Sequence, residues 1–214
     1  MIYETVLFDF HGVFCRDFLF TNLSETHPEA GRFVENELFG RSTDLVDRWM
    51  RGGMTVAEIK NHICGNTGID FDLLSEVLHE GIENMNVDCR LLRLAKTLAD
   101  HGTKVAMVTD NMDIFSDVIV KRHKLDEYIP VIVNSCEHGL LKKDANGKLF
   151  DITFGKLGVS DFGKALLIDD SKTVAPVFQG KGGTVFTFET YEKFEPWMEE
   201  NLLADISKDM VSER

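Results

Sequence analysis

Residues 5–13 read TVLFDFHGV, and this segment sets the architecture of the whole chain. Its first four residues have high strand propensity, and they are followed by a carboxylate and then by a glycine suited to a tight turn. The apolar run is continuous rather than alternating, which is typical of a strand buried on both faces. Such strands occupy the interior of parallel sheets, so we expect an α/β protein built around this segment.

The rest of the chain repeats this strand pattern and alternates it with helices. Four more β-rich apolar runs lie at residues 104–108, 129–133, 165–168 and 184–188. Amphipathic segments of helical length lie between and after them, at residues 87–101, 112–123, 147–157, 171–179 and 190–203. Alternation of this kind predicts a Rossmann-like α/β fold, in which helices cover both faces of a parallel sheet.

Residues 14–86 interrupt this alternation because they contain no convincing strand. Pieces at 28–39, 44–50, 55–64 and 71–84 have helical spacing, and a threonine and a glutamate three residues apart at 55 and 58 suit a capping box. We therefore predict one α/β domain made of residues 1–13 and 87–214. Residues 14–86 are predicted to form a helical domain inserted after the first strand.

The composition excludes several classes of protein. The chain has 214 residues, with 23 Lys and Arg against 36 Asp and Glu, a net charge of −13. Such a surface repels nucleic acids and anionic membranes, so neither is an expected partner. Its four cysteines form no Cys-x-x-Cys pair, and neither a signal peptide nor a membrane span is evident. We expect a cytoplasmic protein, monomeric or homodimeric.

Polar residues follow the predicted strands, and the carboxyl ends of parallel strands meet at the edge where ligands bind. The residues concerned are Asp9, Thr109, Asn111, Lys142 or Lys143, Asp169 and Asp170. Three grouped carboxylates repel one another, and a hard divalent cation such as Mg²⁺ relieves that repulsion. An aspartate can attack phosphorus while a hydroxyl and a lysine hold the phosphoryl oxygens. This set therefore favours phosphoryl transfer.

In this order, the four segments resemble the motifs of the haloacid dehalogenase-like (HAD) hydrolase superfamily. They are LFDFHGV at residues 7–13, MVTDN at 107–111, GLLKKD at 139–144 and LIDDS at 167–171. In the third motif Lys143 stands where proline is usual, and spacing from Gly139 favours Lys142 as the motif lysine, with Lys143 as the alternative. The resemblance also implies that residues 14–86 are a helical cap over the site.

The resemblance implies a role for each matching residue. Asp9 is the expected nucleophile, and Thr109, Lys142 and, less strongly, Asn111 are expected to bind the phosphoryl group. Magnesium is expected to be held by Asp9, Asp169, Asp170 and the backbone carbonyl of His11. The function implied is that of a Mg²⁺-dependent phosphatase acting on a small phosphorylated metabolite.

His11 departs from the family pattern, in which phosphatases usually carry a second aspartate at this position. That aspartate protonates the leaving group and later activates water, and its loss typically costs about 10²–10⁴ in rate. An imidazole could take over this work, so His11 is the candidate proton shuttle, and a polar residue without such a role is the alternative. A catalytically idle relative that binds a phosphometabolite or a protein, and a metal-free dehalogenase, are the rival functions.

Residues of the predicted cap could also face the substrate. Aromatic and arginine side chains are the candidates, although such residues are more often core or solvated surface. They are Phe14, Arg16, Arg48, Trp49 and Arg51.

Overall fold

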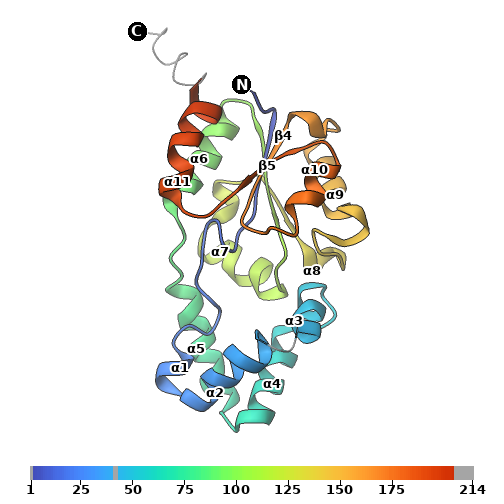
Figure 1. Cartoon of the computed structure of the whole chain (residues 1–214). Helices are drawn as coiled ribbons and strands as arrows, with labels where there is room; N and C mark the ends of the chain where they lie inside the picture. Colours follow the sequence, from blue (N-terminus) through green and yellow to red (C-terminus); the bar gives the residue numbers. More distant parts are fainter. Residues whose placement is uncertain (1, 41–42, 205–214) are drawn as a thin grey trace.

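The computed structural model describes residues 2–40 and 43–204. At its centre is a parallel five-stranded sheet with the strand order β3-β2-β1-β4-β5 (Figure 1). The strands are β1 (Thr5–Phe8), β2 (Lys104–Thr109), β3 (Val131–Asn134), β4 (Ala165–Asp169) and β5 (Thr184–Thr187). The α/β prediction is confirmed, with all five strands close to their expected places. β3 begins two residues late because Pro130 has no N–H to donate to a ladder.

Helices cover both faces of the sheet (Figure 1). Alternate residues of β1 enter different cores: Val6 and Phe8 pack in the cluster that contains α6 and α11, and Leu7 packs with α9 and α10. The bounds of these helices are α6 (Cys89–Asp100), α11 (Tyr191–Met198, continued by the π-helix Glu199–Leu203), α9 (Lys148–Leu157) and α10 (Ala175–Gly180). A continuous apolar strand is what this two-sided burial requires.

Several helix boundaries differ from the sequence prediction. The segment predicted at 112–123 contains a π-helix, η2 (Phe115–Ile119), followed by α7 (Val120–Arg122). α10 begins at Ala175 rather than 171 because turns come first and Pro176 suits only the first helical turn. Elements of three or four residues are too short to show periodicity and were not predicted. They are α1 (Leu23–Thr26), η3 (Leu125–Glu127), α8 (Ser135–His138), η4 (Asp144–Asn146) and η5 (Phe162–Lys164).

Helices fill the segment between β1 and α6, as expected. They are α1, α2 (Pro28–Phe33), the π-helix η1 (Val34–Leu38), α3 (Thr43–Met50), α4 (Val56–Thr67) and α5 (Phe71–Glu83). The predicted capping box begins α4: the Thr55 hydroxyl accepts from the Glu58 N–H, and the Glu58 carboxylate accepts from the Thr55 N–H. These helices lie at the end of the molecule away from α6 and α11 (Figure 1). That residues 14–86 form a domain of their own stays a prediction.

The end of α3, the residue after it and the start of α4 are bonded to the segments that follow β2 and β3. In α4, the Val56 N–H donates to Asp113 at 2.9 Å. The Trp49 indole donates to Asp113 at 2.7 Å. The Arg51 guanidinium makes two 3.0 Å hydrogen bonds to the Asp144 carboxylate. The Ser135 hydroxyl donates to the Met50 carbonyl at 2.6 Å. These bonds hold the helical segment against the carboxyl edge of the sheet.

Within the described ranges, no helix combines the length and the apolar character needed to cross a membrane.

Candidate active site

The ends of the three central strands bring the predicted residues together. Asp9 follows β1 directly, Thr109 ends β2 and Asp169 ends β4. Phe8 pairs with Met107 on one side and with Ile168 on the other, so the three strands end within two residues of one another. The backbone N–H of Asp9 also donates to the Ile168 carbonyl at 2.9 Å, which carries the β1–β4 ladder into the site.

Lys142 lies between two of the carboxylates. Its Nζ is 2.6 Å from Asp9 Oδ2 and 2.7 Å from Asp169 Oδ2, and its side chain is almost wholly buried. Burial alone would lower the pKa of the Lys142 ammonium, but the charges of Asp9 and Asp169, with a contribution from Asp110, raise it above its ordinary value. Lys142 therefore stays protonated. Lys143 is exposed, so the structure places the lysine favoured by motif spacing among the carboxylates.

An acidic cluster surrounds this lysine. Carboxylate oxygens of Asp9, Asp169 and Asp170 lie within 4.8 Å of one another. Burial raises the pKa of Asp169 and the charge of Asp9 adds to that, although the Lys142 ammonium opposes them. The single Lys142 ammonium cannot balance the three carboxylates, so this partly buried site keeps a net negative charge. The residues therefore fit a hard cation with oxygen ligands such as Mg²⁺.

Gly12 makes room for one member of this cluster. Its φ of +84° is a conformation that residues with a side chain rarely adopt. A Cβ at this position would lie 2.2 Å from Asp170 Oδ2. Only glycine lets the loop after β1 pass this close to the Asp170 carboxylate.

Thr109 and Asn111 lie at the end of β2. Thr109 is fully buried, and among the described residues its hydroxyl has no hydrogen-bond partner. A buried, unpaired hydroxyl costs about 1–3 kcal/mol, so it is expected to have a partner in the working protein. The Asn111 Oδ1 accepts from the Met112 N–H at 3.0 Å, and the Asn111 N–H donates to the Ser135 hydroxyl at 3.0 Å. These two bonds fix the loop that carries Asn111.

Asp110 is a site residue to which the sequence patterns assign no role. Its Oδ1 accepts from the Lys142 N–H at 2.7 Å, which ties the loop after β2 to the loop that carries the lysine. Burial raises the pKa of Asp110 to about 6, with Asp9 and Asp169 adding to the rise and Lys142 opposing it. The signal that could have revealed it is its place directly after a strand-ending threonine, beside the predicted phosphoryl-binding residues.

A cavity of about 330 Å³ opens above the cluster. Of the predicted residues, those that line it are Asp9, His11, Asn111, Lys142 and Asp170, whereas Thr109 and Asp169 lie buried behind them. None of the five further candidates in the helical segment and its linker lines the cavity. Phe14 and Trp49 are core, Arg51 is paired with carboxylates and Arg16 bonds the Glu189 carbonyl; Arg48 lies on α3 outside the lining.

His11 is exposed at the cavity wall, two residues after Asp9. Its imidazole contacts the Phe18 ring, with the two ring centroids 5.2 Å apart. The side chain is therefore accessible to a bound molecule, which proton transfer requires. Its role as proton shuttle stays a prediction.

Comparison with known proteins identifies the fold through structures alone. No family model and no curated protein matches the chain. A predicted HAD-like family hydrolase from Porphyromonas gingivalis superposes with a TM-score of 0.74 at 13% identity, covering 94% of this chain and 98% of that one. A HAD family enzyme from Bacteroides thetaiotaomicron gives 0.70 at 18% identity over 86% and 93% of the two chains, and it has also been crystallised with magnesium and inorganic phosphate.

The structural neighbours include more than one chemistry. A HAD phosphatase from Thermococcus onnurineus gives a TM-score of 0.63 at 20% identity, over 85% of this chain and 84% of that one. An L-2-haloacid dehalogenase from Xanthobacter autotrophicus is similar to the chain as well. Sequence identities this low establish a shared architecture and leave the reaction open. The chain has the α/β fold of the haloacid dehalogenase-like superfamily, as its four ordered motifs predict.

Proposed function

We propose that the protein is a Mg²⁺-dependent phosphohydrolase that acts on a small phosphorylated metabolite. The observation that carries this proposal is the acidic cluster of Asp9, Asp169 and Asp170, with the buried Lys142 ammonium set between two of its members. Two carboxylates of the cluster, Asp9 and Asp170, also line the cavity. A nucleophile held beside fixed positive charge is what transfer of a phosphoryl group needs.

Two steps account for hydrolysis with these residues. The Asp9 carboxylate attacks phosphorus, the bond from phosphorus to the leaving oxygen breaks, and that oxygen takes a proton from His11. Water then attacks the aspartyl phosphate, His11 takes the proton from that water, and the bond between phosphorus and Asp9 breaks. Inorganic phosphate leaves, and both side chains return to their starting states. Lys142, the Thr109 hydroxyl and Asn111 hold phosphoryl oxygens throughout.

Magnesium would be held by Asp9, Asp170 and the His11 carbonyl. Asp169 is fully buried behind the cavity lining and would contact the ion either directly or through water. Bound magnesium supplies the positive charge that balances the carboxylates together with an incoming phosphate.

Release of phosphate from a panel of phosphomonoesters, with Mg²⁺ and with EDTA, tests the proposal. The wild type should release phosphate only with Mg²⁺, and Asp9→Asn should lower kcat by about a thousandfold or more. Asp126→Asn is the control, because Asp126 is exposed and lies outside the cavity lining, so it undergoes the same change of side chain away from the site. Turnover that survives Asp9→Asn would refute the proposed nucleophile.

Carbon–halogen hydrolysis is the second candidate, because the structural neighbours include dehalogenases. It would use the same Asp9 nucleophile without metal. Halide release from a 2-haloacid in the presence of EDTA would favour it over the phosphatase. If the protein binds Mg²⁺ and phosphate analogues yet releases neither phosphate nor halide, it is a catalytically idle relative that binds a phosphometabolite or a protein.

A further inference from the structure

Phe18 is unusual, because nearly all the large apolar side chains in residues 2–40 and 43–204 are covered. Its exposed fraction is 58%, and Ile2, close to the N-terminus, is the one other large apolar side chain in the described residues that is exposed. Phe18 lines the same cavity as Asp9 and His11. An exposed phenyl ring inside a concave site, rather than on a convex surface, suggests that a ligand covers it.

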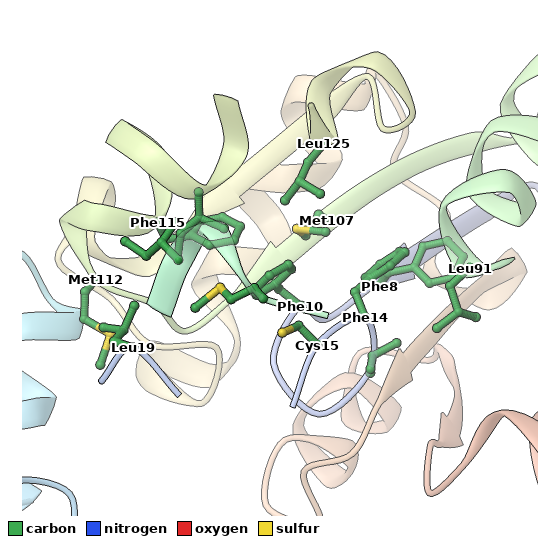
Figure 2. Packing of buried hydrophobic residues seen from close by; sticks show 14 of the residues in the cluster. Phe8, Phe10, Phe14, Cys15, Leu19, Leu91, Met107, Met112, Phe115 and Leu125 are labelled. Carbon is green, nitrogen blue, oxygen red and sulfur yellow. The ribbon is translucent and has the colours of Figure 1, made fainter. Parts of the chain in front are cut away.

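The loop that carries Phe18 is held by packing on both sides of this residue, so the fold itself keeps the Phe18 ring exposed. Phe10, Phe14 and Leu19 of this loop are buried, and Figure 2 shows their side chains in the apolar cluster that also includes Phe8 and Phe115. Phe10 lies 4.9 Å from Phe115 between ring centroids, and Phe14 lies 5.4 Å from Phe8. Anchors on either side of Phe18 leave its ring pointing away from this core.

Other contacts fix the same stretch from its far side. The Thr21 hydroxyl donates to the Phe18 carbonyl at 2.6 Å. In helix α5, a Cβ at Gly81 would lie 2.6 Å from the Leu19 carbonyl oxygen, so only glycine lets the loop lie this close to the helix. The position of Phe18 is therefore set by packing on two sides.

Phe18 is the middle member of a row of rings. Its centroid lies 5.2 Å from that of His11 and 6.1 Å from that of Phe39, with interplanar angles of 49° and 47°. All three residues line the cavity. The ring separations fall within the range of favourable aromatic contacts, and the exposed face of Phe18 leaves room for a further ring.

An anionic leaving group is disfavoured because carboxylates outnumber ammonium groups in the cavity lining: Asp9, Asp17, Asp47, Asp110 and Asp170 against Lys142 and Lys143. Lys142 is committed to Asp9 and Asp169, and the cavity residue Asp47 is paired with Arg51. The remaining lysine, Lys143, is exposed and has no ion-pair partner among the described residues. Away from the acidic cluster the wall is mostly apolar, with members from the helical segment and from the loops: Leu19, Phe39, Val46, Met50, Met85, Met112 and Leu141.

We propose that the substrate is a phosphomonoester of an uncharged aromatic alcohol, whose ring packs against Phe18 beside His11. This inference rests on the proposed function and names the class of leaving group. His11 is then both the proton shuttle and one neighbour of the bound ring, so a ring seated on Phe18 brings the ester oxygen near the imidazole.

Benzyl phosphate and cyclohexylmethyl phosphate test the inference. Their alcohols have similar acidity and ring size, and only benzyl alcohol is aromatic. The wild type should favour benzyl phosphate in kcat/KM. In Phe18→Leu, which keeps apolar bulk, that preference should fall by about threefold to tenfold, chiefly through KM, and Phe18→Tyr should keep it. The intrinsic reactivities of the two esters cancel when these ratios are compared.

Three results would overturn the inference. Equal kcat/KM for the two esters in the wild type, or an unchanged ratio of kcat/KM values in Phe18→Leu, would refute the proposed aromatic contact. Neither result would contradict the proposed phosphatase function. A preference for 4-carboxybenzyl phosphate over benzyl phosphate that disappears in Lys143→Met would show that an anionic leaving group is recognised. Failure of the wild type to hydrolyse any ester would refute the proposed function itself.

Discussion

The two ends of the cavity are built on different principles. At the phosphoryl end, charged groups are buried: Lys142 is 1% exposed and Asp169 is not exposed at all. At the leaving-group end an apolar group is exposed, since 58% of Phe18 is accessible. Side chains at the first end come from the ends of strands, from the loops after them and, for Lys142, from the loop after α8. Phe18 and Phe39, at the second end, come from the segment between β1 and α6.

This difference separates stability from selectivity. At the phosphoryl end Lys142 is paired with Asp9 and Asp169, so removing the lysine leaves two buried carboxylates without their partner. The Phe18 ring at the leaving-group end is mostly exposed, so it can be replaced with little loss of stability. Substitutions at the first end should therefore alter both stability and chemistry, and those at the second should alter substrate choice alone.

Lys142→Met should have the largest effect. Removal of the ammonium leaves the carboxylates of Asp9 and Asp169 buried with no cation between them. In EDTA we expect a loss of about 3–5 kcal/mol in the free energy of unfolding, or a fall in Tm of about 6–20 °C. Added Mg²⁺ should restore part of that loss, because a cation bound by the same carboxylates replaces the missing charge.

Lys143→Met is the matched control for this substitution. It removes the same charge one residue along the chain, at an exposed position, and should change the free energy of unfolding by no more than about 0.5 kcal/mol. Differential scanning fluorimetry of both variants with EDTA and with Mg²⁺ makes the comparison. Equal losses in the two variants would show that the buried ammonium does not balance the cluster.

Asp110→Asn should change how stability depends on pH. The pKa of Asp110 is raised to about 6 in the folded protein, against about 3.9 in the unfolded chain. Its contribution to stability is therefore fully present below about pH 4 and is lost as the pH rises through about 6. Asparagine can still accept from the Lys142 N–H but does not titrate.

Urea unfolding in EDTA at pH 5, 6 and 7 measures this effect. From pH 5 to 6, the wild type should lose stability relative to Asp110→Asn by up to about 1.4 kcal/mol per pH unit. Above pH 6 the difference should level off. A constant difference across the whole range would mean that the Asp110 carboxylate is not perturbed by its surroundings.

Gly12→Ala should damage the cation site more than the fold. Alanine at a φ of +84° costs about 1–2 kcal/mol in backbone strain. Gly102→Ala should cost about as much, since Gly102 has a φ of +89° and a Cβ there would meet nothing within 4 Å. Only Gly12→Ala pushes on the Asp170 carboxylate. Mg²⁺ affinity, measured by calorimetry, should fall about tenfold or more in Gly12→Ala and stay unchanged in Gly102→Ala.

The phosphoryl end could be predicted from sequence because parallel strands align their carboxyl ends. Asp9, Thr109 and Asp169 occupy positions fixed relative to strands that the apolar runs reveal. Lys142 followed from its spacing to Gly139 within the motif. Asp110 was missed because its role depends on a backbone N–H in a distant loop, 32 residues along the chain, which no local pattern encodes.

The leaving-group end could not be predicted because its residues share no period or spacing. Phe14 and Phe18 both follow the first strand at loop positions, yet one is buried against Phe8 and the other is exposed. Trp49 was a candidate for substrate contact, but its indole instead bonds Asp113 across to the core. Which face of a loop residue is covered depends on helices that pack from elsewhere in the chain.

Phe18→Ala should have the smallest effect on stability, and it tests the leaving-group end most directly. A ring this exposed contributes little to the fold, so the free energy of unfolding should change by no more than about 0.5 kcal/mol. Phe14→Ala, in the same loop, removes a buried ring and should cost about 3–5 kcal/mol. Urea denaturation of the two variants measures both changes. A loss in Phe18→Ala as large as that in Phe14→Ala would mean that the Phe18 ring supports the fold, and the division between a structural end and a selective end of the cavity would then be wrong.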